Sequence, residues 1–150
     1  MTPIFNRRQA LALGAGAIGA GLLGASPALA KNDAEDVIGK FTGGKTPAQG
    51  KVVLDLPEIA ENGNTVPMTI SVESPMTEQS YVTDVLVVAN GNPRSGVVHF
   101  HFSPASGVAE ANTRIRLAST QDVIAVARMN DGSFYRSSKQ VKVTIGGCGG

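Results

Sequence analysis

The sequence contains one cysteine and no tryptophan, and only 5% of its 150 residues are aromatic. A single cysteine excludes an internal disulfide, a four-thiolate zinc site and a CxxC redox pair. Scarce aromatic side chains leave few platforms on which nucleic-acid bases or sugars could stack. With 13 basic and 12 acidic residues, the net charge of +1 is too balanced for a protein that binds nucleic-acid phosphates. We therefore expect no nucleic-acid partner.

The first 30 residues have the three parts of an export signal. A short basic start carries Arg7 and Arg8, an uncharged and mostly apolar stretch follows over 10–25, and an Ala-x-Ala pattern ends at Ala30. These features predict a cleaved signal peptide over 1–30, and the paired arginines favour the twin-arginine route over the general secretory route. A membrane anchor is disfavoured because the apolar stretch is short and rich in glycine for a bilayer core about 30 Å thick. Either export route leads to the bacterial periplasm, where we expect the protein.

The region from 31 to 145 has the pattern of one all-β domain. The spacing predicts a short helix over 33–41, and apolar residues then alternate with polar ones, most clearly over 66–73. Several short strands separated by turns are typical of an immunoglobulin-like antiparallel β-sandwich. Strands are predicted over residues 51–56, 66–73, 81–89, 96–102, 113–118, 122–129 and 139–145, and turns over 61–64, 90–93, 104–107 and 130–133.

The single cysteine, Cys148, lies in a glycine-rich tail that follows the last predicted strand. Such a tail buries no apolar area that could offset an ordering cost of about 1–2 kcal/mol per residue, so it is predicted to be disordered. Free cysteines are usually buried, so a cysteine on a solvated tail indicates a chemical role. Three Cα steps beyond Ile145 give the thiol a reach of roughly 10–11 Å, enough to enter the pocket of another protein. The predicted arm consists of Gly146, Gly147, Cys148, Gly149 and Gly150.

Nothing near Cys148 in the sequence would activate its thiol. The tail offers no base and no helix N-terminus, and the carboxylate of Gly150 disfavours a thiolate. A catalyst must hold its nucleophile rigidly, whereas a carrier needs a narrow and mobile arm. The residues therefore favour a non-enzymatic carrier. Two alternatives remain, a periplasmic β-sandwich binding module that forms an intermolecular disulfide through its tail, and a thiol enzyme.

Several segments resemble the SoxY family of sulfur carriers. The most specific is the tail over 146–150, and the preceding strand over 141–145 continues the likeness. The resemblance implies a protein without a cofactor or catalytic residues, whose Cys148 covalently holds sulfur species during periplasmic thiosulfate oxidation. The other segments that carry the resemblance are Arg114–Ala118, Asp131–Phe134, Leu56–Gly63 and the Val66–Pro67 pair.

The same resemblance implies several partners. A SoxZ-like β-sandwich subunit without an export signal would form a heterodimer with the chain, and folded export would let the two leave together. A haem cytochrome would couple thiosulfate to the thiol, a hydrolase would release sulfate, and a sulfane dehydrogenase would oxidise the remaining sulfur.

His99 and His101 lie two residues apart, with Phe100 and Phe102 alternating between and after them. Two such histidines could begin a metal site, but the sequence identifies no third ligand. The favoured interpretation is a polar outer face above an aromatic core, so no metal site is predicted. The acidic residues are too dispersed for their spacing to pair two carboxylates; they include Glu58, Asp84, Glu110 and Asp122.

Overall fold

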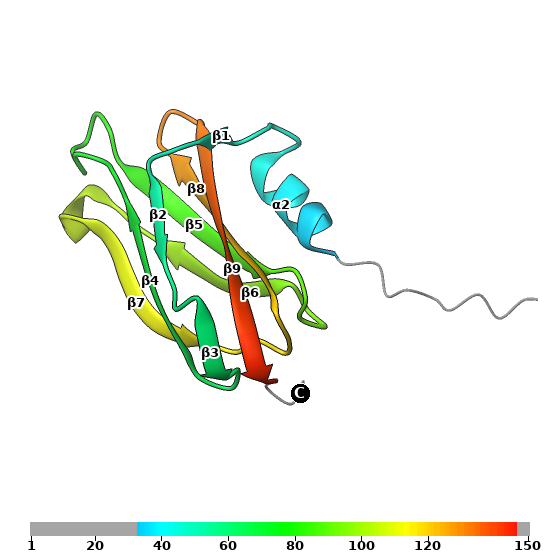
Figure 1. The fold of residues 1–150 in the computed structure, drawn as a ribbon. Helices are drawn as coiled ribbons and strands as arrows, with labels where there is room; N and C mark the ends of the chain where they lie inside the picture. The colour runs from blue at the N-terminus through cyan, green and yellow to red at the C-terminus, as the bar shows by residue number, and fades with distance from the viewer. Residues whose placement is uncertain (1–32, 147–150) are drawn as a thin grey trace, which may run out of the picture. The chain divides into compact units, whose positions relative to one another are not determined.

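The computed structural model describes residues 33–146 of the chain. Over these residues two β-sheets pack face to face, and one α-helix covers the outer face of the larger sheet (Figure 1). No helix among the described residues is long and apolar enough to cross a membrane. The prediction of a β-sandwich is confirmed. The export signal predicted over 1–30 lies outside the described residues.

The larger sheet holds the longest strands and the last one of the chain. In spatial order it runs β1, β9, β8, β5 and β6, while β3 pairs with β9 off this path. All of these pairs are antiparallel except those of β1 and β3, which run parallel to β9. The bounds are β1 Ala48–Gln49, β3 Ile59–Asn62, β5 Val82–Ala89, β6 Gly96–His101, β8 Gln121–Met129 and β9 Phe134–Ile145.

The smaller sheet has three antiparallel strands in the order β2 (Val52–Asp55), β4 (Val66–Val72) and β7 (Ala109–Ile115). A 3-10 helix, η1 (Pro104–Ser106), precedes β7. Alternate residues of β4 are buried against the larger sheet, as the alternation in the sequence predicts. The core therefore lies between the two sheets.

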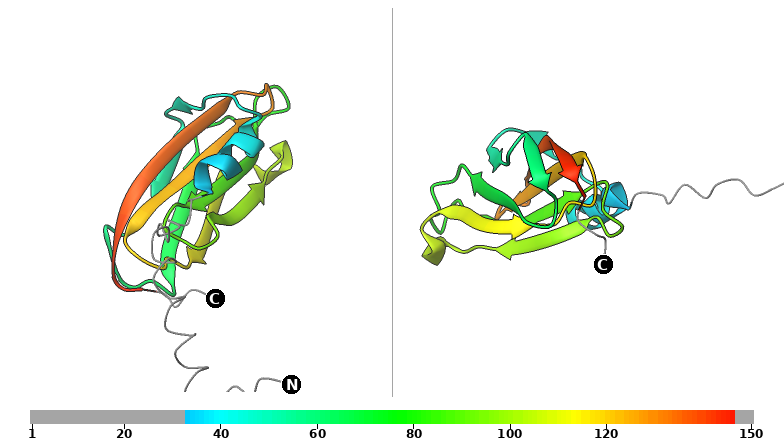
Figure 2. Two further views of the ribbon diagram at one scale, coloured as in Figure 1. Left: turned by 90° about the vertical axis from the view of Figure 1, so that its right-hand side faces the viewer. Right: turned by 60° about the horizontal axis from the view of Figure 1, so that its bottom comes forward.

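Helix α2 (Ala34–Thr42) explains why β5 and β8 are apolar on both faces. One face of each strand enters the core, and the other packs under the helix, where Ile38 meets Leu86 and Ile124. Figure 2 shows the helix lying across the larger sheet. The helix ends at Gly43, whose φ of 63° suits a residue without a Cβ. The predicted helix over 33–41 is confirmed to within one residue.

Four strand predictions are wrong in position or missing. β1 and β3 were not predicted, and β3 overlaps the turn expected over 61–64. β3 buries only Ala60 and is held by its backbone pairing with β9, so it has no apolar period. β7 lies at 109–115 instead of 113–118, and β9 begins at Phe134 instead of Lys139, because the missed half of each strand lacks a regular alternation of large apolar and polar residues.

Candidate functional site

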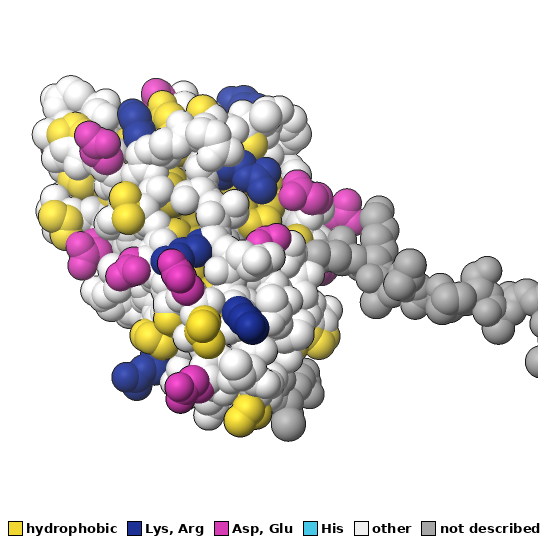
Figure 3. All heavy atoms as spheres, in the orientation of Figure 1, with side chains coloured by type: hydrophobic (Ala, Val, Ile, Leu, Met, Phe, Trp, Pro, Cys, Tyr) yellow, Lys and Arg dark blue, Asp and Glu magenta, His cyan; other side chains and the backbone are white. Residues whose placement is uncertain are grey.

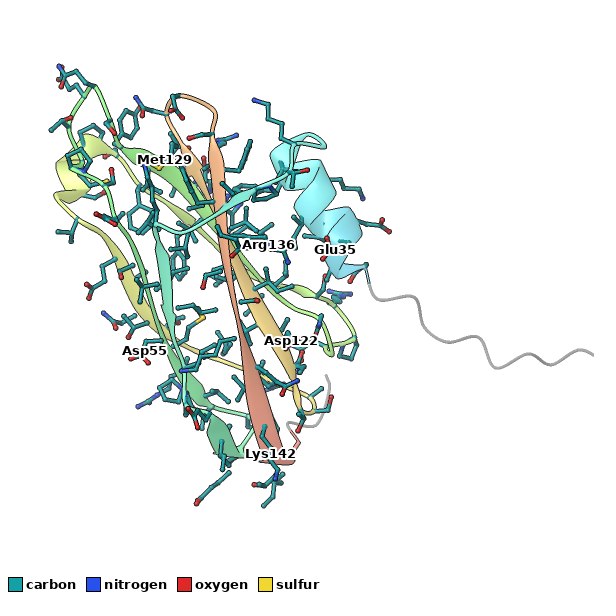
Figure 4. All side chains as sticks on the ribbon, turned by 45° about the horizontal axis from the view of Figure 1, so that its top comes forward. Glu35, Asp55, Asp122, Met129, Arg136 and Lys142 are labelled. Carbon is teal, nitrogen blue, oxygen red and sulfur yellow. The ribbon has the colours of Figure 1, made fainter. Side chains whose placement is uncertain are left out.

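Strand β9 leads to the base of the predicted arm, and its end is held from both sides. On one side, the Gly63 N–H donates to the carbonyl of Ile145 at 2.8 Å, next to the parallel pairing with β3. On the other side, the Val143 N–H donates to Thr120 Oγ1 at 3.0 Å. Figure 4 shows Lys142 at this end of the strand. The strand thus ends between two neighbours and not as a free edge.

Gly146 is the first residue of the predicted arm, and it lies against the loop between β7 and β8 (residues 116–120). A Cβ built on Gly146 would lie 2.3 Å from the carbonyl oxygen of Ala118, far inside van der Waals contact. A backbone oxygen cannot rotate away as a side chain can, so this position admits only glycine unless the backbone shifts. The glycine at the arm base therefore has a steric cause.

Two amide side chains hold the β7–β8 loop in place beside Gly146. Gln121 is only 4% exposed, and its Nε2 donates to the Ser119 carbonyl at 3.0 Å and to Asn92 Oδ1 at 2.9 Å. Asn92 Oδ1 also accepts the N–H of Ala118 at 2.9 Å. The carbonyl that meets the arm base is thus positioned by a partly buried hydrogen-bond network.

A second polar group lies on the outer face of the larger sheet, beside α2. Asp84 of β5 is opposite His101 of β6 and Arg128 of β8. Its Oδ1 lies 2.7 Å from His101 Nδ1 and 3.3 Å from His99 Nε2, while its Oδ2 accepts a hydrogen bond from the Arg128 guanidinium. Burial alone would raise the pKa of Asp84, but hydrogen bonds with Thr83 and Arg128 outweigh burial and lower it.

The faces of β6 are as predicted. Phe100 and Phe102 pack against the core, whereas His99 and His101 are exposed on the outer face. The covalent attachment site, the rest of the arm and the export arginines stay predictions, because these residues lie outside the part of the chain that the structure describes: Arg7, Arg8, Gly147, Cys148, Gly149 and Gly150.

Sequence reasoning missed the residues that hold each of the two polar groups together. Asp84 and Arg128 each interrupt an apolar strand, and a charge in such a strand is the signal that could have drawn attention to them. Asn92 falls in the turn predicted over 90–93, and Gln121 begins β8. Their contact joins parts of the chain about thirty residues apart, which no local pattern reveals.

The surface carries both signs of charge without a large patch of either on the face drawn in Figure 3. Lys, Arg, Asp and Glu side chains alternate over this face, which also shows separate hydrophobic side chains. Such mixing matches the net charge of +1. It does not resemble the basic stripe of a protein that binds nucleic acid.

Known structures with the same fold include a sulfur carrier and several superoxide reductases. The sulfur carrier protein SoxY from Chlorobium limicola f thiosulfatophilum is 31% identical, with a TM-score of 0.60 over 74% of this chain and 96% of that one. A superoxide reductase from Ignicoccus hospitalis is 14% identical, with a TM-score of 0.57 over 63% of this chain and 80% of that one. A putative superoxide reductase from Thermotoga maritima is 18% identical, with a TM-score of 0.52 over 69% and 89%. The two reductases show the fold alone.

A search among curated proteins finds no match. The family model described as sulfur oxidation protein SoxY matches residues 38–148, which is most of the chain. This match agrees with the SoxY structure from Chlorobium limicola, because the alignment with this chain covers 96% of that structure. The chain therefore belongs to the SoxY family of sulfur oxidation proteins.

Proposed function

We propose that the protein is a covalent sulfur carrier of thiosulfate oxidation, which holds sulfur intermediates on Cys148 while other proteins act on them. The observation that carries this proposal is the extent of the SoxY family match, which runs to residue 148 and so includes the cysteine. The SoxY from Chlorobium limicola, itself a sulfur carrier protein, supports the same assignment. The protein supplies no catalytic residue and no cofactor in this proposal.

The proposed cycle begins with an oxidative coupling. The Cys148 thiol and thiosulfate form a sulfur–sulfur bond, the thiol loses its proton, and two electrons pass to a haem cytochrome partner. The product is a cysteine S-thiosulfonate. A partner hydrolase then adds water to the terminal sulfonate, which releases sulfate and a proton and leaves a persulfide on Cys148. A sulfane dehydrogenase oxidises that persulfide sulfur further.

The arm base supports a carrier because it offers a fixed starting point for the thiol. Hydrogen bonds hold Ile145 and Val143 on both sides of β9, and Gly146 lies against the Ala118 carbonyl. From this point the covalent length of the chain gives Cys148 a reach of roughly 10–11 Å. The glycines Gly147, Gly149 and Gly150 add no side chain to the arm, so a narrow passage in a partner enzyme could accept it.

We further propose that the protein acts in the periplasm together with a SoxZ-like β-sandwich subunit. Arg7 and Arg8, at the start of the predicted signal peptide over 1–30, support export by the twin-arginine route. This route carries folded proteins, so a partner without its own signal could leave the cytoplasm with this chain.

The mass of the intact protein tests the proposal. The native protein is exposed to thiosulfate and to its oxidising partners, and its mass is measured before and after reduction. We expect additions of thiosulfonate or of whole sulfur atoms on the monomer, all removed by reductant. Disulfide dimers without any monomeric adduct would instead support a binding module with an intermolecular disulfide.

A relocated thiol provides a matched control. The double variant Cys148→Ser and Ser138→Cys keeps one cysteine but places it on the exposed surface of β9, without an arm. We expect this variant to react with a small thiol reagent and to acquire no sulfur adduct from the partner enzymes. Sulfur oxidation by Cys148→Ser alone, at the rate of the unmodified protein, would refute the assignment.

A further inference from the structure

The only two histidines of the chain converge on one buried carboxylate oxygen. His99 and His101 project from one face of β6, and Asp84 projects toward them from the neighbouring strand β5. The side chain of Asp84 is 6% exposed, whereas those of His99 and His101 are 41% and 71% exposed. A buried anion therefore lies below two accessible imidazoles.

The two carboxylate oxygens of Asp84 have different neighbours. Oδ2 accepts a hydrogen bond from the Arg128 guanidinium, and Oδ1 faces the two imidazoles. Arg128 is itself held, since its Nε donates to Thr83 Oγ1 at 3.1 Å. The orientation of the carboxylate is thus set by contacts outside the cluster, as is common for carboxylates that bind metals.

Aromatic packing limits the ring of His99 in a similar way. The Phe41 ring, near the end of α2, contacts it edge to face with ring centroids 5.4 Å apart. The rings of His99 and His101 lie with centroids 4.4 Å apart. Paired strands, a partly buried ion pair and an aromatic contact therefore hold three potential ligands near one point.

We propose that Asp84, His99 and His101 bind a divalent transition-metal ion of the zinc and copper class. Their potential ligand atoms all lie within 4.8 Å of one another. Ligands at about 2.0–2.1 Å from a tetrahedral ion lie about 3.3 Å apart, the separation of His99 Nε2 and Asp84 Oδ1. The 2.7 Å between His101 Nδ1 and Asp84 Oδ1 is shorter than this separation, so the exposed ring of His101 must move back to admit the ion.

The chemistry of the ligands selects the class of ion. The positive charge of Arg128 offsets the negative charge of the Asp84 carboxylate, so we expect the two imidazoles to supply most of the affinity. Imidazole nitrogen favours Zn²⁺, Cu²⁺ and Ni²⁺, whereas Mg²⁺ and Ca²⁺ favour oxygen ligands. Three protein ligands at an exposed position leave at least one coordination position for water or a small anion.

The experiment uses the full chain without an affinity tag and with the substitution Cys148→Ser, because a thiolate would also bind these ions. Titration with Zn²⁺ at pH 7.5 is followed by calorimetry, and Cu²⁺ binding by electron paramagnetic resonance. We expect one ion per chain, nitrogen couplings in the copper spectrum and no displacement of Zn²⁺ by a hundredfold excess of Mg²⁺. Any imidazole coupling must come from His99 or His101, since the chain has no other histidine.

The variants His99→Ala and His101→Ala separate the site from non-specific binding. Each should weaken Zn²⁺ binding at least tenfold, and because both side chains are exposed, the thermal unfolding of the apoprotein should change little. Asp55→Asn is the control, since this exposed carboxylate lies on the smaller sheet (Figure 4) and should leave binding unchanged. A copper spectrum without nitrogen coupling, or equal Zn²⁺ affinity in the histidine variants, would overturn the proposal.

Discussion

At the scale of single residues, Gly146 combines two requirements in one position. It begins the arm that we propose for the sulfur cargo, and it passes the Ala118 carbonyl at a distance that excludes a side chain. Flexibility alone would tolerate alanine, because the φ of Gly146 does not lie in the left-handed region that favours glycine. The close approach does not, so the two requirements can be separated by mutation.

Gly146→Ala should shift the end of β9 or the β7–β8 loop, since its Cβ would lie 2.3 Å from a backbone oxygen. We expect a loss of roughly 1–3 kcal/mol in the free energy of unfolding, measured by urea titration. Sulfur loading by the partner enzymes should fall as well. Gly96→Ala is the control, because a Cβ at Gly96 would meet nothing within 4 Å. Equal stability of the two variants would contradict the close approach.

Gln121→Ala tests the network that positions the Ala118 carbonyl. The substitution removes a buried side chain together with its donors to Ser119 and Asn92 and its acceptor of the Gly91 N–H. We expect a loss of about 2–4 kcal/mol in the free energy of unfolding. Gln140→Ala, at an exposed position of β9, should stay within about 0.5 kcal/mol of the unmodified protein. A loss in Gln121→Ala as small as that in Gln140→Ala would show that the network contributes little to stability.

At the scale of elements, the tight connection between β8 and β9 depends on one aspartate. Asp131 Oδ1 accepts the N–H of Ser133 at 2.8 Å and its hydroxyl at 2.6 Å. These hydrogen bonds lower the pKa of Asp131. A carboxyl whose pKa is lower in the folded state stabilises the fold above its ordinary pKa, and this stabilisation is lost as the pH falls through the folded value.

The turn should therefore show a pH-dependent contribution below the ordinary aspartate pKa of 3.8. At pH 7 we expect Asp131→Asn to unfold at a lower urea concentration than the unmodified protein, because the amide accepts the same hydrogen bonds without a charge. The difference should shrink as the pH is lowered toward 2.5. A constant difference over this range would show that the charge of Asp131 does not act through the turn.

The elements that sequence alone predicts are those with an apolar period. β4 alternates along its length and α2 has one apolar face, so both were placed almost correctly. β1 and β3 depend on backbone pairing with a strand far along the chain, and they carry no such period. The candidate sites divide in the same way. Cys148 is recognisable from the sequence as a single cysteine among glycines, whereas Asp84 meets the histidines only through strand register.

At the scale of the whole molecule, the described residues end in a strand that is built into the sandwich. Val141 is fully buried, and the residues after it pair with β3, so this part of β9 belongs to the sandwich. The arm that follows is proposed to serve function and not stability. Fold and cargo site should therefore respond separately to truncation.

Two truncated chains test this separation. A chain that ends at Gly146 should unfold within about 0.5 kcal/mol of the full chain and carry no sulfur. A chain that ends at Gln140 loses Val141 and the β3 pairing, so its free energy of unfolding should fall by more than about 3 kcal/mol. Circular dichroism during urea titration measures both. A large loss in the first chain would show that the arm contributes to the fold.

The position of β9 also determines when the protein can fold. It lies inside the larger sheet, between β8 and the two parallel strands β1 and β3, although it comes last in the sequence. During synthesis, β8, β1 and β3 therefore lack the strand with which they pair until β9 has left the ribosome. The larger sheet therefore closes through contacts between distant parts of the chain, which are slow to form. A newly made chain thus exposes apolar strands until β9 pairs with its neighbours, and this exposure makes it prone to aggregation.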